Sequence, residues 1–385
     1  MIKVKFLLHA TFRSNPEFEL VEQGNLNPQE LRALADLNTD PEFFGLFRRK
    51  HMEAAGSAKL AYKEVALLFY FLQHAGELPH YFKSGYDDDV NLTMAKLVLE
   101  GIFEIQAGQH FYSGFAAHDF LYEAQDARFY RRHPLLEIST AAIQYGVLLK
   151  EADQASLASK LYAYNTMPLF FMPANALGTL EEVEEFLRIG KNNRRNRELL
   201  ANWNKHEPNP DYRWISWSRK HSRRRDTKPH SIYKIYISPV LEELPEVFEK
   251  TISVLTKSQA FSFKIGMNRE GLLRPDKFVA YFTEMGHLLA AAEMLAPVLK
   301  KHKAQGVPFT ASLDETGMLS WGMDSTTDET TKNREGGSWR AIVTEKLAAS
   351  ITLSKTERLP PAESVDFVLK KMMLEGVDTM TWTAA

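Results

Sequence analysis

The chain has 385 residues, of which 44% are hydrophobic and 25% charged, and its formal net charge is -2. This composition is typical of a globular protein with a substantial core, and the near-neutral charge selects neither nucleic acid nor a membrane surface as a partner. The absence of cysteine excludes disulfides, thiolate nucleophiles and Cys-ligated metal centres. No apolar run approaches the roughly 18 residues of a membrane helix, and the first residues lack a signal-peptide pattern. We therefore expect a cytoplasmic protein.

The first half of the chain is predicted to be mainly helical. Between its helices, one β-hairpin is predicted from Ile102 to Tyr112, where Ala107-Gly108 joins two runs rich in aromatic residues. Helices followed by a hairpin also occur in winged-helix modules, so that arrangement remains an alternative for part of this region. Apolar residues at helical spacing, or a preceding turn, predict helices over residues 58–74, 135–150, 155–164 and 181–189.

A basic linker is predicted to follow. Residues 191–228 contain 12 Lys or Arg against 4 Asp or Glu, and Asn and Pro interrupt regular structure there. The run Arg223–Arg225, with Trp203, Trp214 and Trp217 nearby, has the residue types that bind phosphates and stack on bases. Because the whole chain is not basic, we favour a linker that docks on the acidic remainder of the chain, and nucleic acid is not the expected partner.

In the second half of the chain, segments with a strand pattern occur between segments with a helix pattern, which predicts an α+β domain. Its order of strand, helix, strand, strand, helix, strand is that of a split βαβ sandwich. We expect strands over residues 231–237, 260–265, 277–282 and 308–311, and helices over 241–255, 283–302 and 338–350 and after 364. The expected division is a mainly helical domain over 1–205, the basic linker over 206–228, the α+β domain over 229–360 and a C-terminal helix or tail over 361–385.

Two lysines stand inside apolar strands of the predicted α+β domain. Lys234 lies within Ile232–Tyr236 and Lys264 within Phe261–Ile265. A lysine on a central strand must extend to solvent, pair with a carboxylate or meet an anionic ligand, because burial of an unpaired ammonium is costly. If alternation puts both side chains on one face, they can act together.

Two arginines can join these lysines. Arg274 and Lys277 flank Asp276 before a predicted strand, so an ion pair can hold them in place. Arg340 opens a predicted helix, and helix N-termini favour anions. Lys234, Lys264, Arg274 and Arg340 are thus expected to converge on one anionic group. The alternative is a solvent-exposed sheet face whose lysines point outward.

The C-terminal pattern resembles the HopA-type effector fold of bacterial type III effectors, over about residues 231–350. The resemblance rests on YKIY, FSFKIG, the Gly-Leu-Leu-Arg-Pro-Asp turn, KFVAYF, LSWGMD and the SWR helix start. In the loop between Asp324 and Gly337 the spacing of Asn and Gly departs from that pattern, which weakens the assignment of Arg340. Related domains in class V lanthipeptide clusters imply a lyase that eliminates phosphate from phosphorylated Ser or Thr.

The resemblance implies roles for particular residues. A lysine base would remove the proton, fixed cations would take the phosphate, and a hydroxyl or ammonium would support the developing enolate. It implies no metal or organic cofactor and a peptide or protein substrate, and it admits a kinase-like partner protein. The charge and the lack of a long apolar run already argue against a membrane partner. The predicted catalytic residues are Lys264, Lys234 and Tyr236, and the predicted substrate-binding residues are Arg274, Lys277, Arg340 and Tyr233.

A second function fits the same residues. An effector-like or scaffold protein without catalysis could use the cationic face to bind acidic or phosphorylated peptides, and secretion as an effector would then apply. The aromatic content of 24 Phe, 14 Tyr and 6 Trp suits a binding surface as well as a core. Whether the chain is an enzyme is left open by the sequence.

Overall fold

The computed structural model confirms an α+β architecture and divides the chain into two compact units. One lies within residues 1–129 and Leu353–Gly376, and the other within 130–352 and Val377–Ala385. These unit boundaries differ from the domain boundaries that the sequence predicted on either side of the basic linker, residues 206–228. Among the residues described, no helix is long and apolar enough to cross a lipid bilayer. The structure describes residues 4–37, 39–50, 58–85, 90–121, 133–150, 153–168, 176–191, 193–207, 214–220, 231–325 and 338–384.

The first unit combines helices with two three-stranded antiparallel sheets. The predicted hairpin is present as β5 and β6, with Ile105 opposite Tyr112. β1 joins the hairpin, and β2, β3 and β4 form a second sheet, so this unit has more strands than the mainly helical domain with one hairpin that the sequence predicted. The described strands of this unit are β1 (Phe12–Ser14), β2 (Phe18–Glu22), β3 (Phe43–Arg49), β4 (Lys59–Tyr62), β5 (Phe103–Ala107) and β6 (His110–Tyr112), in the orders β1-β5-β6 and β2-β3-β4.

The helix expected over 58–74 begins as a strand. Residues 59–62 form β4 against β3, and the helix proper starts at Lys63. The described α-helices of the unit are α1 (Pro28–Ala33), α2 (Lys63–Phe71), α3 (His80–Gly85), α4 (Val90–Leu99), α5 (His118–Leu121) and α14 (Pro361–Leu374).

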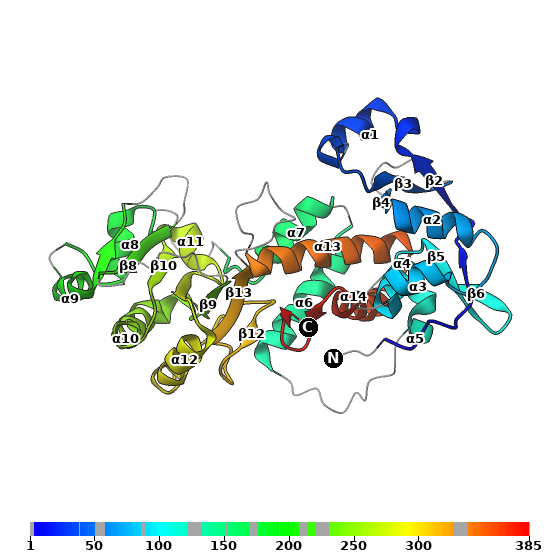
Figure 1. The fold of residues 1–385 in the computed structure, drawn as a ribbon. Coiled ribbons are helices and arrows are strands. Elements are labelled where there is room, and N and C mark those ends of the chain that lie inside the picture. The colour runs from blue at the N-terminus through cyan, green and yellow to red at the C-terminus, as the bar shows by residue number, and fades with distance from the viewer. Residues whose placement is uncertain are drawn as a thin grey trace. The chain divides into compact units, whose positions relative to one another are not determined.

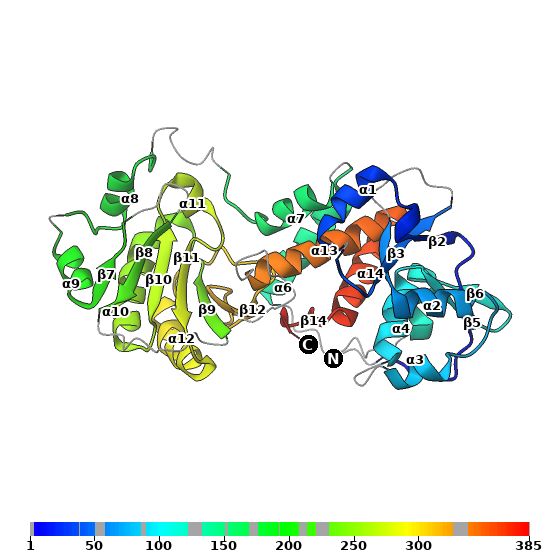
Figure 2. The ribbon, with the colours of Figure 1, turned by 45° about the horizontal axis from the view of Figure 1, so that its top comes forward.

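The second unit is built on a seven-stranded antiparallel sheet with the order β12-β13-β9-β11-β10-β8-β7 (Figures 1 and 2). Helix α10 connects β9 to β10, and β11 lies between those two strands, so the predicted split βαβ arrangement is present. The fourth strand of that arrangement is β13 and not the strand predicted over residues 308–311, of which only Ala311 belongs to a strand, β12. The described strands are β7 (Trp203–Lys205), β8 (Trp214–Arg219), β9 (Ser231–Ile237), β10 (Ser262–Gly266), β11 (Phe278–Phe282), β12 (Ala311–Ser312), β13 (Leu319–Ser325), and the separate pair β14 (Val377–Asp378) and β15 (Thr383–Ala384).

Part of the predicted linker belongs to this sheet. β8 pairs with β10, with Trp217 opposite Phe263 and Ser216 opposite Lys264. The side chains of Trp203 and Trp217 are fully buried in the core, so neither ring is available to stack on a base. The Arg223–Arg225 run lies outside the described residues.

One face of the sheet is apolar and carries the main core. Ile235, Phe263 and Phe278 are completely buried on it. Helices α10 and α12 pack side by side against this face (Figure 1). The described α-helices of the unit are α6 (Pro134–Leu148), α7 (Gln154–Tyr162), α8 (Leu180–Phe186), α9 (Arg194–Asn202), α10 (Leu244–Lys257), α11 (Arg269–Leu273), α12 (Met285–Leu299) and α13 (Trp339–Thr356), and the division between the units falls within α13.

The turn from β10 into α11 depends on a glycine. A Cβ atom added to Gly266 would lie 2.7 Å from the carbonyl oxygen of Gly271 and 2.8 Å from the amide nitrogen of Leu272. Backbone atoms cannot yield as a flexible side chain can, so Gly266→Ala is expected to lower the free energy of unfolding by about 2 kcal/mol or more. Chemical denaturation measures this loss.

Gly286→Ala is the matched control, because an added Cβ at Gly286 in α12 meets nothing within 4 Å. That variant should be as stable as the wild type or slightly more so. Equal stability of the two variants would show that the β10–α11 turn tolerates a side chain.

Candidate functional site

The polar face of the seven-stranded sheet carries the two strand lysines. Lys234 lies opposite Tyr281 in β11, and Tyr281 lies opposite Ser262 in β10. Lys264 is two residues beyond Ser262, and side chains two apart on a strand share a face. Lys234 and Lys264 therefore lie on the same face, with the ring of Tyr281 between their strands.

Lys264 is surrounded by aromatic rings. Its Nζ lies 4.2 Å from the ring centre of Trp214 and 5.7 Å from that of Tyr281. Among the described residues it has neither a hydrogen bond nor an ion pair. Burial, followed by the charge of Lys234, lowers the pKa of Lys264 to about 8. A substantial fraction of this amine is therefore neutral near physiological pH.

Lys234 is held by a carboxylate. Its Nζ forms an ion pair with Asp324 in β13, and the two side chains are 11% and 15% exposed. It also lies 5.7 Å from the ring centre of Tyr281. Lys234 is thus a fixed cation rather than a free amine.

Arg274 follows α11 and is fixed in a fork geometry. Its Nε and Nη2 donate to the two carboxylate oxygens of Asp276 at 2.8 and 2.9 Å. Its Cζ lies 5.4 Å from the ring centre of Trp214, which also contacts Lys264. Burial opposes the charge of Arg274, but the bonds with Asp276 outweigh it and raise the pKa of the guanidinium. The predicted Arg274–Asp276 ion pair is confirmed, and the side chain of Arg274 remains 29% exposed.

Arg340 is too deeply buried to contact a phosphate directly. Its side chain is only 1% exposed. Nη1 donates to Asp276 at 2.8 Å, Nη2 donates to the carbonyl oxygen of Tyr162 at 2.7 Å, and the guanidinium stacks on the Tyr162 ring at 4.3 Å. Its neighbours close it off from a ligand, which corrects the expectation that Arg340 grips the anion.

Three other predicted residues differ in the face they occupy and in their burial. Tyr233 faces the main apolar core on the opposite side of the sheet, because it alternates with Lys234. Tyr236 shares the face of the lysines but is 3% exposed and packs with Val279 and Val307. Lys277 is fully buried. These positions correct the proposed roles of Tyr233 and Lys277 as substrate contacts, whereas the catalytic role of Tyr236 stays a prediction.

The buried ammonium of Lys277 serves the fold. Its Nζ donates to the carbonyl oxygen of Pro239 at 2.7 Å and to the side chain of Gln305. Gln305 in turn donates to the carbonyl oxygens of Asn165 and Leu273 at 2.6 and 3.0 Å. Burial lowers the pKa of Lys277 to about 7. These bonds tie the start of β11 to the segment that follows α7.

The structure adds residues that the sequence analysis did not assign to this site. Tyr281, Trp214 and Asp324 surround the two lysines, and Tyr162 donates its hydroxyl to Asp276 at 3.3 Å. Alternation in β11 could have indicated Tyr281, since it is two residues from Val279 on the polar face. Trp214 carried no such signal, because β8 was taken as linker.

Asp276 is the anionic centre of this arrangement. It is 4% exposed and accepts hydrogen bonds from two arginines and one tyrosine. Burial alone would raise its pKa, but Arg340 and then Arg274 hold the pKa of this carboxyl well below its usual range. Asp276→Asn leaves the buried Arg340 charge uncompensated, so we expect it to lower the free energy of unfolding by about 3–5 kcal/mol in chemical denaturation.

Asp324→Asn is the comparison for this prediction. Asp324 is more exposed and holds one cation, Lys234, rather than two, so its loss should cost less. An Asp276→Asn protein as stable as the Asp324→Asn protein would contradict the central position of Asp276.

We define the cationic patch as Lys234, Lys264 and Arg274 on the polar sheet face. The buried Arg340 adds a fourth cation to these three. The two carboxylates of Asp276 and Asp324 offset two of the four positive charges, which leaves a formal excess of +2 when Lys264 is protonated. The charges of Lys234, Arg274, Asp276 and Asp324 all act on Lys264. Such a surface attracts a small anion and can present a partly neutral amine to it.

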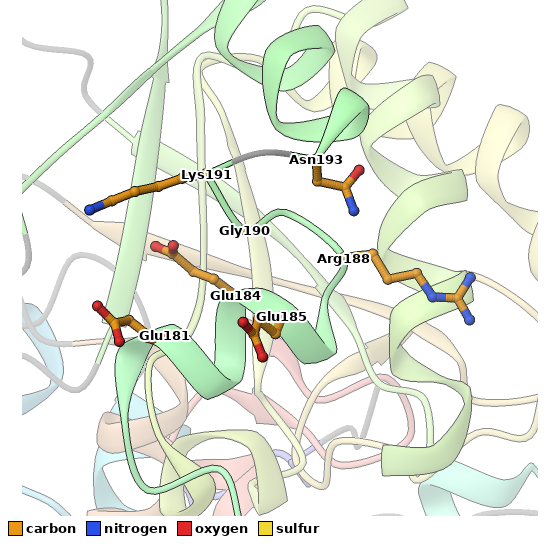
Figure 3. Close-up of a pocket in the computed structure, with 7 residues that line it drawn as sticks. All are labelled: Glu181, Glu184, Glu185, Arg188, Gly190, Lys191 and Asn193. Carbon is orange, nitrogen blue, oxygen red and sulfur yellow. The ribbon is translucent and has the colours of Figure 1, made fainter.

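Two hollows that are lined by described residues lie elsewhere in this unit. The larger, of about 500 Å³, is bordered by three acidic side chains of α8 (Figure 3). Within the described residues, no group of His, Asp and Glu has a metal-binding arrangement. None of the predicted site residues lines either hollow. The residues of the larger hollow are Glu181, Glu184, Glu185, Arg188, Gly190, Lys191 and Asn193.

Comparison with solved structures finds distant likenesses. Two are effector proteins of Pseudomonas syringae, from pv. tomato strain DC3000 and pv. syringae strain 61, with TM-scores of 0.38 and 0.39 and 16% and 12% identity. These matches cover 65% and 66% of this chain and 98% and 99% of the effectors. A phosphothreonine lyase matches with a TM-score of 0.28 and 12% identity, over 55% of this chain and 96% of the lyase. No family model and no curated protein matches the chain. At these values the likenesses do not assign the chain to a family.

Proposed function

We propose that this chain is a phosphate-eliminating lyase that acts on phosphorylated Ser or Thr in a peptide or protein. The observation that carries the proposal is Lys264, an amine with a lowered pKa and no carboxylate partner among the described residues, beside two cations that are held in place. A structural lysine is normally paired or solvated, whereas an amine kept partly neutral next to fixed positive charge suits proton abstraction.

The reaction assigns one task to each part of the patch. The neutral amine of Lys264 takes the proton from the α-carbon of the phosphorylated residue and becomes an ammonium. The electron pair of that C–H bond forms the double bond between the α- and β-carbons. The bond between the β-carbon and the phosphate oxygen breaks, and the phosphate leaves with the bonding pair.

The departing phosphate gains negative charge, which the patch can stabilise. Arg274 contributes a guanidinium oriented by Asp276, and Lys234 contributes an ammonium oriented by Asp324. Because carboxylates already fix both cations, little reorganisation is needed when charge develops on the phosphate. Lys264, once protonated, adds a third positive charge.

The developing enolate oxygen needs a hydrogen-bond donor. Tyr281 is the best-placed candidate, since its ring lies between the two lysines on the same face. Burial raises the pKa of the Tyr281 hydroxyl, so it stays protonated and able to donate. Tyr281 replaces Tyr233 and Lys277 in this role, and Tyr236 is the second candidate on the same face.

Binding without catalysis is the second candidate. The formal excess of +2 and the aromatic rings of Trp214 and Tyr281 would also suit an acidic or phosphorylated peptide. In that case Lys264 acts as a ligand in its charged form rather than as a base.

One experiment separates the two. The purified full chain is incubated with peptides that contain phosphothreonine or phosphoserine, and mass spectrometry follows loss of the elements of phosphoric acid while a colour assay follows free phosphate. Elimination gives both signals in equal amounts. Peptide binding with neither signal would reject the lyase and favour the binding protein.

A further inference from the structure

Asp276 connects the cationic patch to the first turn of helix α13. One carboxylate accepts two bonds from Arg274, at 2.8 and 2.9 Å, and a bond from Arg340 at 2.8 Å. Arg274 is a patch cation, whereas Arg340 is the second residue of α13. The carboxylate of Asp276 therefore fixes both Arg274, a cation of the patch, and Arg340, at the start of α13.

Asp324 repeats this arrangement from another strand. It forms an ion pair with Lys234, a patch cation, and its Oδ1 accepts the backbone amide of Trp339 at 3.1 Å. Trp339 is the first residue of α13. Its indole also donates to the carbonyl oxygen of Trp382 at 2.8 Å, so a second hydrogen bond links this turn to the C-terminal segment.

We propose that docking of the first turn of α13 regulates the affinity of the cationic patch for an anion through the shared carboxylates Asp276 and Asp324. The proposal rests on the anion site of the proposed function and adds a way in which the affinity of that site is regulated. Asp276 and Asp324 act as positioning residues, and the helix start acts through them.

The sign of the coupling follows from competition for the carboxylates. When the turn is docked, Arg340 and the Trp339 amide share the negative charge of Asp276 and Asp324, and Arg274 and Lys234 keep more positive potential. When the turn is released, both carboxylates neutralise the patch cations alone and anion binding weakens. Linkage then requires that an anion on the patch stabilises the docked turn by the same factor.

Trp339→Phe tests this without altering the patch. Phenylalanine keeps the backbone amide that Asp324 accepts but removes the indole donor to Trp382, so the turn is loosened and both carboxylates remain. Trp321→Phe is the matched control, because Trp321 is also half-buried and packs against the main core on the apolar face of the sheet. Arg340→Lys is a second variant, which shortens the contact with Asp276 and retains the charge.

The experiment measures two quantities on the full chain. Calorimetric titration with inorganic phosphate gives the affinity, and hydrogen exchange followed by mass spectrometry gives the opening of the first turn of α13. We expect phosphate to slow exchange of that turn in the wild type. Trp339→Phe and Arg340→Lys should weaken phosphate binding on the order of tenfold, while Trp321→Phe changes it less than twofold.

The outcomes separate this proposal from the lyase. Faster exchange in Trp339→Phe and Arg340→Lys with unchanged phosphate affinity would overturn the coupling and leave the lyase standing. Coupled changes in a protein that never eliminates phosphate would support the regulation and reject the catalysis. Failure of the wild type to bind phosphate would overturn the coupling together with the anion site.

Discussion

Replacement of Lys264 by methionine is expected to reduce phosphate elimination by about 10³-fold, because the reaction loses the group that takes the proton. Methionine fills similar space between Trp214 and Tyr281 without an amine. The rate of phosphate release from a phosphothreonine peptide measures the effect. Elimination that persists within tenfold of the wild-type rate would show that another group is the base.

Lys264→Arg distinguishes a base from a ligand. A guanidinium keeps the positive charge but stays protonated at all accessible pH values, so it cannot accept the proton. We expect Lys264→Arg to bind inorganic phosphate within a few-fold of the wild type and to be as inactive as Lys264→Met. Arg274→Lys should retain part of the activity, since it replaces a forked contact by a single one and leaves the base intact.

The stability of Lys264→Met gives an independent check. The lowered pKa means that the fold disfavours the ammonium, so the unfolded chain binds more protons between about pH 8 and the ordinary lysine pKa. Removing the amine should raise the free energy of unfolding at pH 7 by about 1–2 kcal/mol, and the gain should fade as pH rises above 8. A residue that costs stability where it stands is typical of a functional site.

The sequence predicted the centre of the second unit better than its edges. Strands β9 and β10 each carry a lysine within an apolar, aromatic pattern and β11 is a short apolar run, and their expected ranges agree closely with the structure. β8 was missed because its strand pattern, Trp214–Arg219, lies in a basic stretch with Asn and Pro nearby. Its pairing with β10 depends on tertiary contacts that local composition does not reveal.

The candidate site could be predicted only in part. Alternation allowed Lys234 and Lys264 to share a face, and the short spacing between Arg274 and Asp276 allowed their ion pair. The burial of Arg340 depends on how α13 docks on Asp276 and Tyr162, which are far apart in sequence. No local pattern could therefore distinguish a buried anchor from a phosphate ligand.

The pH dependence of elimination and that of phosphate binding should have opposite signs. The base must be neutral, and Lys264 has a pKa lowered to about 8 by burial and by Lys234. The value of kcat/KM is therefore expected to rise roughly tenfold per pH unit below about pH 8 and to level off above it. Phosphate binding gains from the charged form, so its affinity should fall as pH rises through about 8.

Steady-state rates and calorimetric titrations between about pH 7.5 and 9.5, where both the phosphopeptide and inorganic phosphate are mainly dianionic, measure both trends. Lys277 also titrates near this range, because burial lowers its pKa to about 7. Lys264→Arg removes this ambiguity, since it deletes the Lys264 titration and keeps Lys277. Phosphate affinity of Lys264→Arg should lose the fall near pH 8, and any dependence that remains belongs to other groups. If elimination instead slowed as pH rose through about 8, the charged form of Lys264 would be the active one, and the amine would act as a phosphate ligand or an acid rather than as the base.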